Sequence, residues 1–209
     1  MRPIPSPPVQ LITGPWSDLS DLSRRVEAAL RGGIRWVQLR AKDRCARDLH
    51  DAAIALAPLL REAGVLFVVN DRVDIALAAG ADGVHLPDSG MTAADARRLL
   101  GPSAWIGRSL HSVDAIVSLG RGDVDAVQFG PVFETASKRG YGAPQGLAGL
   151  ARAANAMREG PGGALIAVGG ITAERAPSCR SAGAGAIAVI GAIWEAADVE
   201  GAARVIIEN

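Results

Sequence analysis

Short hydrophobic runs of four to six residues alternate with longer amphipathic stretches along nearly the whole chain. This alternation is typical of repeated strand–helix units that build a parallel sheet. The pattern predicts eight such units, in which an amphipathic helix follows each strand. The predicted strands span residues 9–13, 36–40, 66–70, 83–85, 105–108, 126–130, 164–168 and 186–190.

Two of the predicted helices carry clear local signals. Residues 48–62 repeat apolar side chains at helical spacing, and Pro58 is predicted to kink this helix. Residues 92–100 begin at Thr92, whose hydroxyl suits an N-cap.

Eight strand–helix units without a long linker predict one (β/α)8 barrel, with short loops because the chain is shorter than is usual for that fold. The barrel is expected to span residues 9–209, after a proline-rich extended arm at 1–8. A doubly wound open sheet is the alternative. It would require a glycine-rich fingerprint after the first strand, which residues 13–16 do not supply.

Composition narrows the class of partner. The 209 residues include 22 Lys+Arg and 22 Asp+Glu, a balance that argues against a nucleic-acid or anionic membrane surface. Cys45 and Cys179 have neither metal nor C-x-x-C spacing, which favours a reducing compartment.

The longest uncharged run, 181–194, is too short for a membrane helix, and the early prolines do not suit a signal peptide. We therefore expect a cytoplasmic protein, and apolar helix faces favour a homodimer.

In a barrel of this type the active site lies at the carboxyl ends of the strands. After the second strand, period-two alternation places Gln38, Arg40 and Lys42 on one face. An amide beside two cations suits a polar ring and a pyrophosphate, because a guanidinium can bind two oxygens and an ammonium adds a point charge. A solvated strand edge is the structural alternative.

Polar residues also follow the third, fourth and fifth strands. They are Asn70, Asp71, His85, Asp88, Ser109 and His111. Asp71 suits either a divalent cation or a helix cap. His85 is predicted to be a structural histidine. Ser109 can hold a phosphate oxygen, and His111 either moves a proton or merely starts a helix.

The segment 129–147 is the longest irregular stretch, and long loops in a compact barrel are usually functional. Its Thr135, Ser137 and Lys138 suit an anion clamp, and its Gly140, Gly142 and Pro144 are expected to act as hinges of a lid. Glycines after the seventh and eighth strands, each predicted to lead straight into a helix, suit a phosphate at a helix N-terminus.

Six motifs occur in order at these strand ends: VQLRAK, NDRVDIALAAGADGVHL, GRSLH, FGPVFETASK, VGGIT and AVIGAI. The set resembles thiamine phosphate synthases and the closely related TenI-type thiazole tautomerases. In a synthase, an aminopyrimidine pyrophosphate loses pyrophosphate to give a carbocation, which the nitrogen of a thiazole phosphate captures. The resemblance therefore implies two small-molecule substrates and Mg²⁺.

The resemblance also implies site residues. Those that would hold the pyrimidine pyrophosphate are Gln38, Arg40, Lys42, Asn70, Ser109 and Lys138, with Arg40, Ser109 and Lys138 as the catalytic set. Asp71 would bind magnesium. The thiazole phosphate pocket would comprise Thr135, Ala136, Ser137, Gly169, Gly170, Ile190 and Gly191.

The chain departs from the synthase motif at the second magnesium ligand, where Gly90 replaces the usual aspartate and Asp88 lies two residues earlier. We expect Asp88 to take that role, although loss of a carboxylate weakens a Mg²⁺ site. A tautomerase needs no metal and is the first alternative, with His111 as its proton-transfer candidate, but Pro131 stands where its catalytic histidine belongs. A non-catalytic barrel that binds a thiamine precursor is the second alternative.

Overall fold

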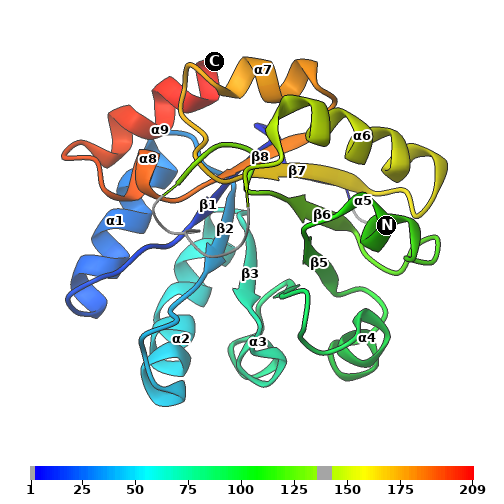
Figure 1. The fold of residues 1–209 in the computed structure, drawn as a ribbon. Coiled ribbons are helices and arrows are strands. Elements are labelled where there is room, and N and C mark those ends of the chain that lie inside the picture. The colour runs from blue at the N-terminus through cyan, green and yellow to red at the C-terminus, as the bar shows by residue number, and fades with distance from the viewer. Residues whose placement is uncertain (1–2, 136–142) are drawn as a thin grey trace.

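The chain folds into a closed barrel of eight parallel strands, in the order β1 to β8, as the sequence predicts. The computed structural model describes residues 3–135 and 143–209. In Figure 1 the strands lie at the centre and the helices surround them. The strands are β1 (Val9–Ile12), β2 (Trp36–Leu39), β3 (Leu66–Asn70), β4 (Gly83–Leu86), β5 (Trp105–Leu110), β6 (Ala126–Phe129), β7 (Ala164–Val168) and β8 (Ala186–Val189).

The helices between the strands differ widely in length. They are α1 (Leu19–Arg31), α2 (Ala46–Glu62), α3 (Val73–Ala79), α4 (Ala93–Leu100), α5 (Val113–Val117), α6 (Gly146–Glu159), α7 (Ala176–Ser181), α8 (Gly191–Trp194) and α9 (Val199–Glu208). Thr92 caps α4 by accepting from the Asp95 N–H at 3.1 Å, as predicted. Helix α2 continues through Pro58.

The prediction that β7 leads straight into a helix is wrong. Residues 169–175 separate β7 from α7, because Gly169 and Gly170 turn the backbone at φ values of +97° and +65°. Most predicted strands end within one residue of the observed ones. Strand β2 stops at Leu39 because the N–H of Arg40 donates to the Thr13 hydroxyl, at 2.9 Å, instead of to a neighbouring strand.

Alternation along the strands divides their side chains between two packed layers. Outward residues such as Leu11, Val37 and Val69 pack with the helices in the larger core cluster. The inward cluster fills the barrel and comprises Ile12, Trp36, Val68, Trp105, Ala126, Ile166, Ala186 and Ala188, with Ile4 of the N-terminal arm packed against it. The barrel is therefore closed by its own side chains below the carboxyl mouth.

Two indole rings dominate the barrel interior. The rings of Trp36 and Trp105 are fully buried and meet edge to face, with centroids 5.2 Å apart and an interplanar angle of 79°. Glycines leave room for the ring of Trp105 and for its backbone. A Cβ at Gly107 would lie 2.5 Å from the Trp105 ring, and one at Gly83 would lie 1.8 Å from the Trp105 carbonyl oxygen.

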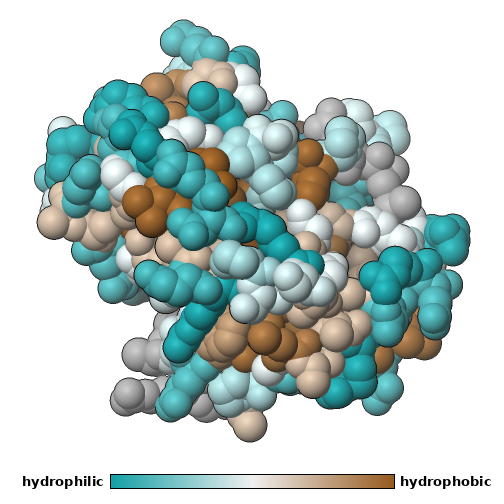
Figure 2. All heavy atoms as spheres, turned by 90° about the horizontal axis from the view of Figure 1, so that it is seen from above, coloured by the Kyte–Doolittle hydropathy of each residue, from teal (hydrophilic) through white to brown (hydrophobic). Residues whose placement is uncertain are grey.

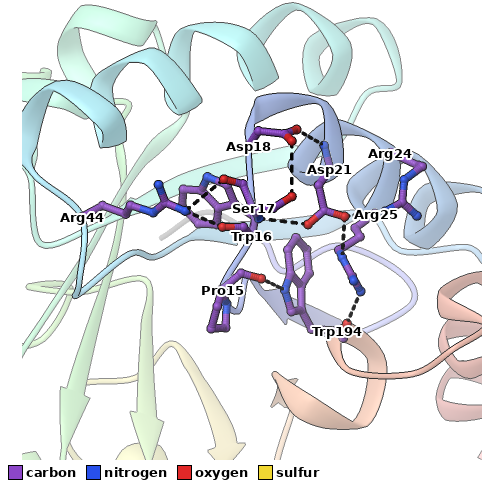
Figure 3. A network of polar contacts seen from close by, with 9 residues as sticks. All are labelled: Pro15, Trp16, Ser17, Asp18, Asp21, Arg24, Arg25, Arg44 and Trp194. Atoms are coloured by element: carbon purple, nitrogen blue, oxygen red, sulfur yellow. Dashed lines mark hydrogen bonds and ion pairs between the residues drawn. The ribbon is translucent and has the colours of Figure 1, made fainter.

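The loop between β1 and α1 is held from both sides (Figure 3). On one side the indole N–H of Trp194 donates to the Pro15 carbonyl at 2.7 Å, and Arg25 donates to the Trp194 carbonyl at 2.8 Å. On the other side the Arg44 guanidinium donates to the Trp16 carbonyl and lies over its ring, 5.5 Å from the centroid. Helix α8 and the β2–α2 loop thereby fix the start of α1.

The Asp21 carboxylate organises this network. It accepts hydrogen bonds from the Ser17 N–H at 3.2 Å and from Arg25 Nε at 3.0 Å, and it also pairs with Arg24. Burial alone would raise the pKa of Asp21. The hydrogen bonds from Ser17 and Arg25 and the charges of Arg25 and Arg24 outweigh burial, so this pKa lies below its ordinary value of 3.8.

On the face shown in Figure 2, hydrophobic residues reach the surface in small groups separated by hydrophilic ones. Within residues 3–135 and 143–209, no helix combines the length and the apolar character needed to cross a membrane.

The packing around Trp105 predicts a strong effect of one methyl group. Gly83→Ala places a Cβ against backbone that cannot yield, so it should destabilise the fold by about 3 kcal/mol or more. Gly185→Ala is the matched control, because its Cβ would meet nothing closer than the Leu165 carbonyl at 3.7 Å. Denaturant unfolding of both variants measures the difference, and equal midpoints would contradict this description of the interior.

The Asp21 network predicts that the free energy of unfolding depends on pH. Asp21→Asn should lower the free energy of unfolding by about 1 kcal/mol near neutral pH, because it removes charge-assisted hydrogen bonds. The pKa of Asp21 is lower in the folded state than in the unfolded state, so the ionised carboxylate stabilises the fold at pH values above its unfolded-state pKa. This stabilisation is lost as the pH falls through the folded-state pKa. The free energies of unfolding of wild type and variant should therefore begin to converge as the pH falls below about 4. A difference that persists unchanged at acidic pH would show that the carboxylate charge contributes nothing.

Candidate active site

A polar cavity of about 640 Å³ opens at the carboxyl ends of β2 to β5. We call it the first cavity. It collects seven residues predicted from the sequence, which are Arg40, Lys42, Asn70, Asp71, Asp88, Ser109 and His111. Arg44 and Arg72 also line it, so its lining holds four cationic and two acidic side chains. Two of the cations also have partners beside the cavity, since Arg72 pairs with Asp74 and Arg44 donates to the Trp16 carbonyl. This excess of positive charge suits a multiply charged anion.

The end of β2 carries its polar residues as the alternation predicts. Thr13 fixes the backbone of Arg40, since its hydroxyl accepts from the Arg40 N–H at 2.9 Å and donates to the Arg40 carbonyl at 3.1 Å. Gln38 lies one pleat deeper and is 1% exposed. Its Nε2 has no hydrogen-bond partner among the described residues. A buried amide donor in this state is costly unless a ligand or water accepts from it.

A tight turn after β3 places Asp71 in the first cavity. Asp71 has a φ of +66° and is the sole residue other than glycine with positive φ in the described part of the chain. Its N–H donates to the His85 carbonyl at 2.8 Å, and its carbonyl accepts from the Val73 N–H at 3.1 Å. A left-handed backbone at a residue with a side chain is unfavourable and often marks a functional position. The N-cap of α3 is Arg72, which favours the cation-binding interpretation of Asp71 over the capping one.

The loop after β4 explains the departure at Gly90. The Gly90 N–H donates to the Pro87 carbonyl at 3.1 Å, and a Cβ at position 90 would lie 2.7 Å from the Pro87 ring. An aspartate there would require the turn to shift. Asp88 instead lines the first cavity, and Arg108 holds its carbonyl through a hydrogen bond of 2.7 Å.

Two histidines lie beneath and beside the first cavity. His85, expected to be structural, is buried, and its Nε2 lies 2.8 Å from the Ser109 hydroxyl oxygen. His111 lines the cavity, and its Nδ1 lies 2.6 Å from the Gly130 carbonyl oxygen. Gln145 donates to the His111 carbonyl at 3.0 Å, so the residues that directly follow β5 and β6 meet the N-cap of α6 here.

A second cavity of about 350 Å³ lies at the carboxyl ends of β7 and β8. The predicted residues that line it are Thr135, Gly169, Gly170, Ile190 and Gly191. Gly169 and Gly170 are required here for space as well as conformation. A Cβ at Gly170 would lie 2.8 Å from the Glu134 carbonyl oxygen, and one at Gly169 would lie 2.6 Å from the Pro131 side chain.

The sequence did not identify some of the residues that line the two cavities. Arg44 continues the alternation of Arg40 and Lys42 by two further residues, a signal that could have identified it. Arg175 and Glu195 line the second cavity. Arg175 donates to the Gly170 carbonyl at 2.8 Å and lies over the Phe133 ring, contacts between separate loops that no local pattern indicates.

Part of the predicted anion clamp lies outside the described residues. The predictions that fall there concern Ala136, Ser137, Lys138, Gly140 and Gly142.

The fold and these two cavities define a (β/α)8 barrel with a cation-rich site and a glycine-lined site at one mouth. The model of the family described as "Thiamine monophosphate synthase" matches residues 9–193. The chain belongs to this family.

Relatives and solved structures agree with this membership. A thiamine-phosphate synthase of Chlorobium luteolum is 47% identical over 180 residues, which cover 86% of this chain and 82% of that protein. One of Methanoculleus marisnigri is 42% identical over 185 residues, with 88% and 84% covered. The solved thiamine phosphate pyrophosphorylase of Pyrococcus furiosus superposes with a TM-score of 0.83 at 31% identity, covering 96% of this chain and 93% of that one. An orotidine 5'-phosphate decarboxylase of Pyrococcus horikoshii, at 16% identity and a TM-score of 0.67, shares the fold alone.

Proposed function

We propose that the chain is a thiamine phosphate synthase, which joins 4-amino-5-hydroxymethyl-2-methylpyrimidine pyrophosphate to thiazole phosphate in thiamine biosynthesis and releases pyrophosphate. The observation that carries this proposal is the first cavity, where Arg40, Lys42, Arg44 and Arg72 gather on the mouth that also holds the glycine-lined second cavity. Two phosphate-bearing substrates require two such sites. The family and the names of its members support the same reaction.

In this reaction the bond between the pyrimidine methylene carbon and the pyrophosphate oxygen breaks, and its electron pair leaves with the pyrophosphate. The thiazole nitrogen then supplies the electron pair of the new carbon–nitrogen bond. Arg40, Lys42 and Ser109 stabilise the charge that develops on the leaving group. Gln38 and Asn70 are assigned to the pyrimidine, and the unpartnered Nε2 of Gln38 supports this assignment. Lys138 is proposed as a further pyrophosphate contact.

The donor set of the first cavity fits Mg²⁺. Two carboxylates, Asp71 and Asp88, line the same cavity, and the left-handed backbone of Asp71 holds it at the mouth. Among the described residues no group of three or more metal-binding side chains occurs, but Mg²⁺ typically takes only one or two carboxylates together with waters and substrate phosphates. Bound there, the ion would neutralise charge on the pyrophosphate.

The second cavity is assigned to the thiazole phosphate. Glycines at 169, 170 and 191 let backbone N–H groups approach a phosphate closely. Thr135, Ala136 and Ser137 would supply further contacts and Ile190 an apolar wall. This arrangement sets the thiazole beside the pyrimidine at one mouth, so the reaction is promoted by positioning as well as by charge.

One residue favours the synthase over the tautomerase. It stands at the position where a tautomerase is expected to have its catalytic histidine. Pro131 stands there, and its buried ring holds no proton to transfer.

A homodimer and a cytoplasmic location are also proposed. Leu77, Leu99 and Val117, on the neighbouring helices α3 to α5, are each more than half exposed, which supports a self-association surface.

Loss of a pyrophosphate contact should reduce turnover without unfolding the protein. Arg40→Ala and Lys138→Ala should each lower kcat roughly tenfold or more, because each removes a charge aimed at the leaving group. The control is Arg204→Ala on α9, whose guanidinium pairs with Glu200 at the surface. The assay follows thiamine phosphate formation from both substrates with Mg²⁺. Wild-type rates in both Arg40→Ala and Lys138→Ala would refute the synthase assignment.

The proposed role of Asp88 predicts a selective change in metal dependence. Asp88→Asn should raise the Mg²⁺ concentration needed for half-maximal activity by roughly tenfold, because a neutral amide binds Mg²⁺ less well than a carboxylate. Ser89→Ala, the neighbour in the same cavity, should leave this requirement unchanged. Identical magnesium titrations of wild type and Asp88→Asn would exclude Asp88 as the replacement ligand.

A further inference from the structure

His85 is a buried imidazole that the proposed reaction does not yet use. It lies in β4 with 1% of its surface exposed, and its Nε2 lies 2.8 Å from the Ser109 hydroxyl oxygen on neighbouring β5. Ser109 reaches the first cavity, whereas His85 does not line it. Ser109 therefore connects the imidazole to the first cavity.

The surroundings of His85 restrict how its ring can move. A Cβ at position 107 would lie 2.7 Å from His85 Nδ1, so glycine at this position leaves the space that the imidazole uses. The main chain of His85 is equally constrained, because its carbonyl accepts from the Asp71 N–H at 2.8 Å. The side chain thus presents Nε2 to Ser109 from a fixed position.

The chemistry of the hydroxyl determines the direction of this hydrogen bond. A serine hydroxyl has one hydrogen and two lone pairs. If Ser109 donates its hydrogen to Nε2, only lone pairs face the cavity, and they repel a phosphate oxygen. If Nε2 carries a hydrogen and donates it to Ser109, the hydroxyl hydrogen is free to bind the anion.

We propose that His85 is a positioning residue whose Nε2 carries a hydrogen, donates it to the Ser109 hydroxyl and thereby directs that hydroxyl's hydrogen to the pyrophosphate. This inference rests on the proposed function for the identity of the anion. It predicts that His85 contributes to pyrophosphate binding and turnover only while Ser109 is present.

Two amide variants, each of which replaces one ring nitrogen, separate this role from simple packing. In His85→Gln the amide nitrogen can occupy the position of Nε2, whereas in His85→Asn it reaches only the position of Nδ1. We expect His85→Asn to lower kcat/KM roughly tenfold and to weaken binding of inorganic pyrophosphate, measured by calorimetry. His85→Gln should restore most of both. Thermal unfolding of each variant checks that the folded state is retained.

A double-mutant cycle tests the dependence on Ser109. Adding His85→Asn to Ser109→Ala should cause no further loss of activity or pyrophosphate affinity. Losses that multiply would mean that His85 acts independently of the hydroxyl, and a Gln variant as impaired as the Asn variant would exclude hydrogen-bond donation from Nε2. Either result would overturn the inference.

The tautomer can also be read directly from the wild-type protein. Nitrogen-15 NMR of the three histidines, assigned with His50 and His111 variants, should show that the His85 hydrogen is on Nε2. A hydrogen on Nδ1 instead would refute the proposal even if every variant failed to fold. If the tautomer is as predicted but the wild type forms no thiamine phosphate, the proposed function fails and the hydrogen-bond assignment stands.

Discussion

The structure depends on packing two tryptophans inside one eight-stranded barrel. The rings of Trp36 and Trp105 fill much of the interior, and small residues such as Gly107 and Ala126 lie in the same layer. Gly83 leaves space for the backbone of Trp105 on the neighbouring strand. Protein interiors are packed about as densely as crystals of small organic molecules, so one additional methyl group here destabilises the fold. The register of the strands around this interior decides which residues reach the mouth.

One pleat above this apolar layer the inward residues become polar, and above these lies the cavity. Gln38 and His85 lie in the buried layer, with Arg40 and Ser109 at its upper edge. The buried layer is costly unless its polar groups are paired or bind ligand, and the Ser109 contact of His85 shows one such pairing. The same strands therefore provide both a rigid base and a charged surface, which is the arrangement that catalysis by positioning requires.

The strands and most of the first cavity follow from local sequence, because hydrophobic runs and period-two alternation depend on residues adjacent in the chain. That reasoning placed Arg40, Lys42 and Asn70 together correctly. It failed where residues distant in sequence decide the outcome. The length of the turn after β7 and the contacts of Arg175 depend on how separate loops meet, and the pairing of His85 with Ser109 depends on strand register.

The proposed function requires one mouth of the barrel to hold two anion sites, with pyrophosphate and thiamine phosphate bound side by side. The most direct test is a crystal structure of the protein with thiamine phosphate, pyrophosphate and Mg²⁺. Pyrophosphate should lie within hydrogen-bond distance of Arg40 and Ser109, with Mg²⁺ on Asp71 and the phosphate of thiamine phosphate against Gly169 and Gly170. Pyrophosphate bound away from the first cavity, or both anions competing for the second, would contradict it.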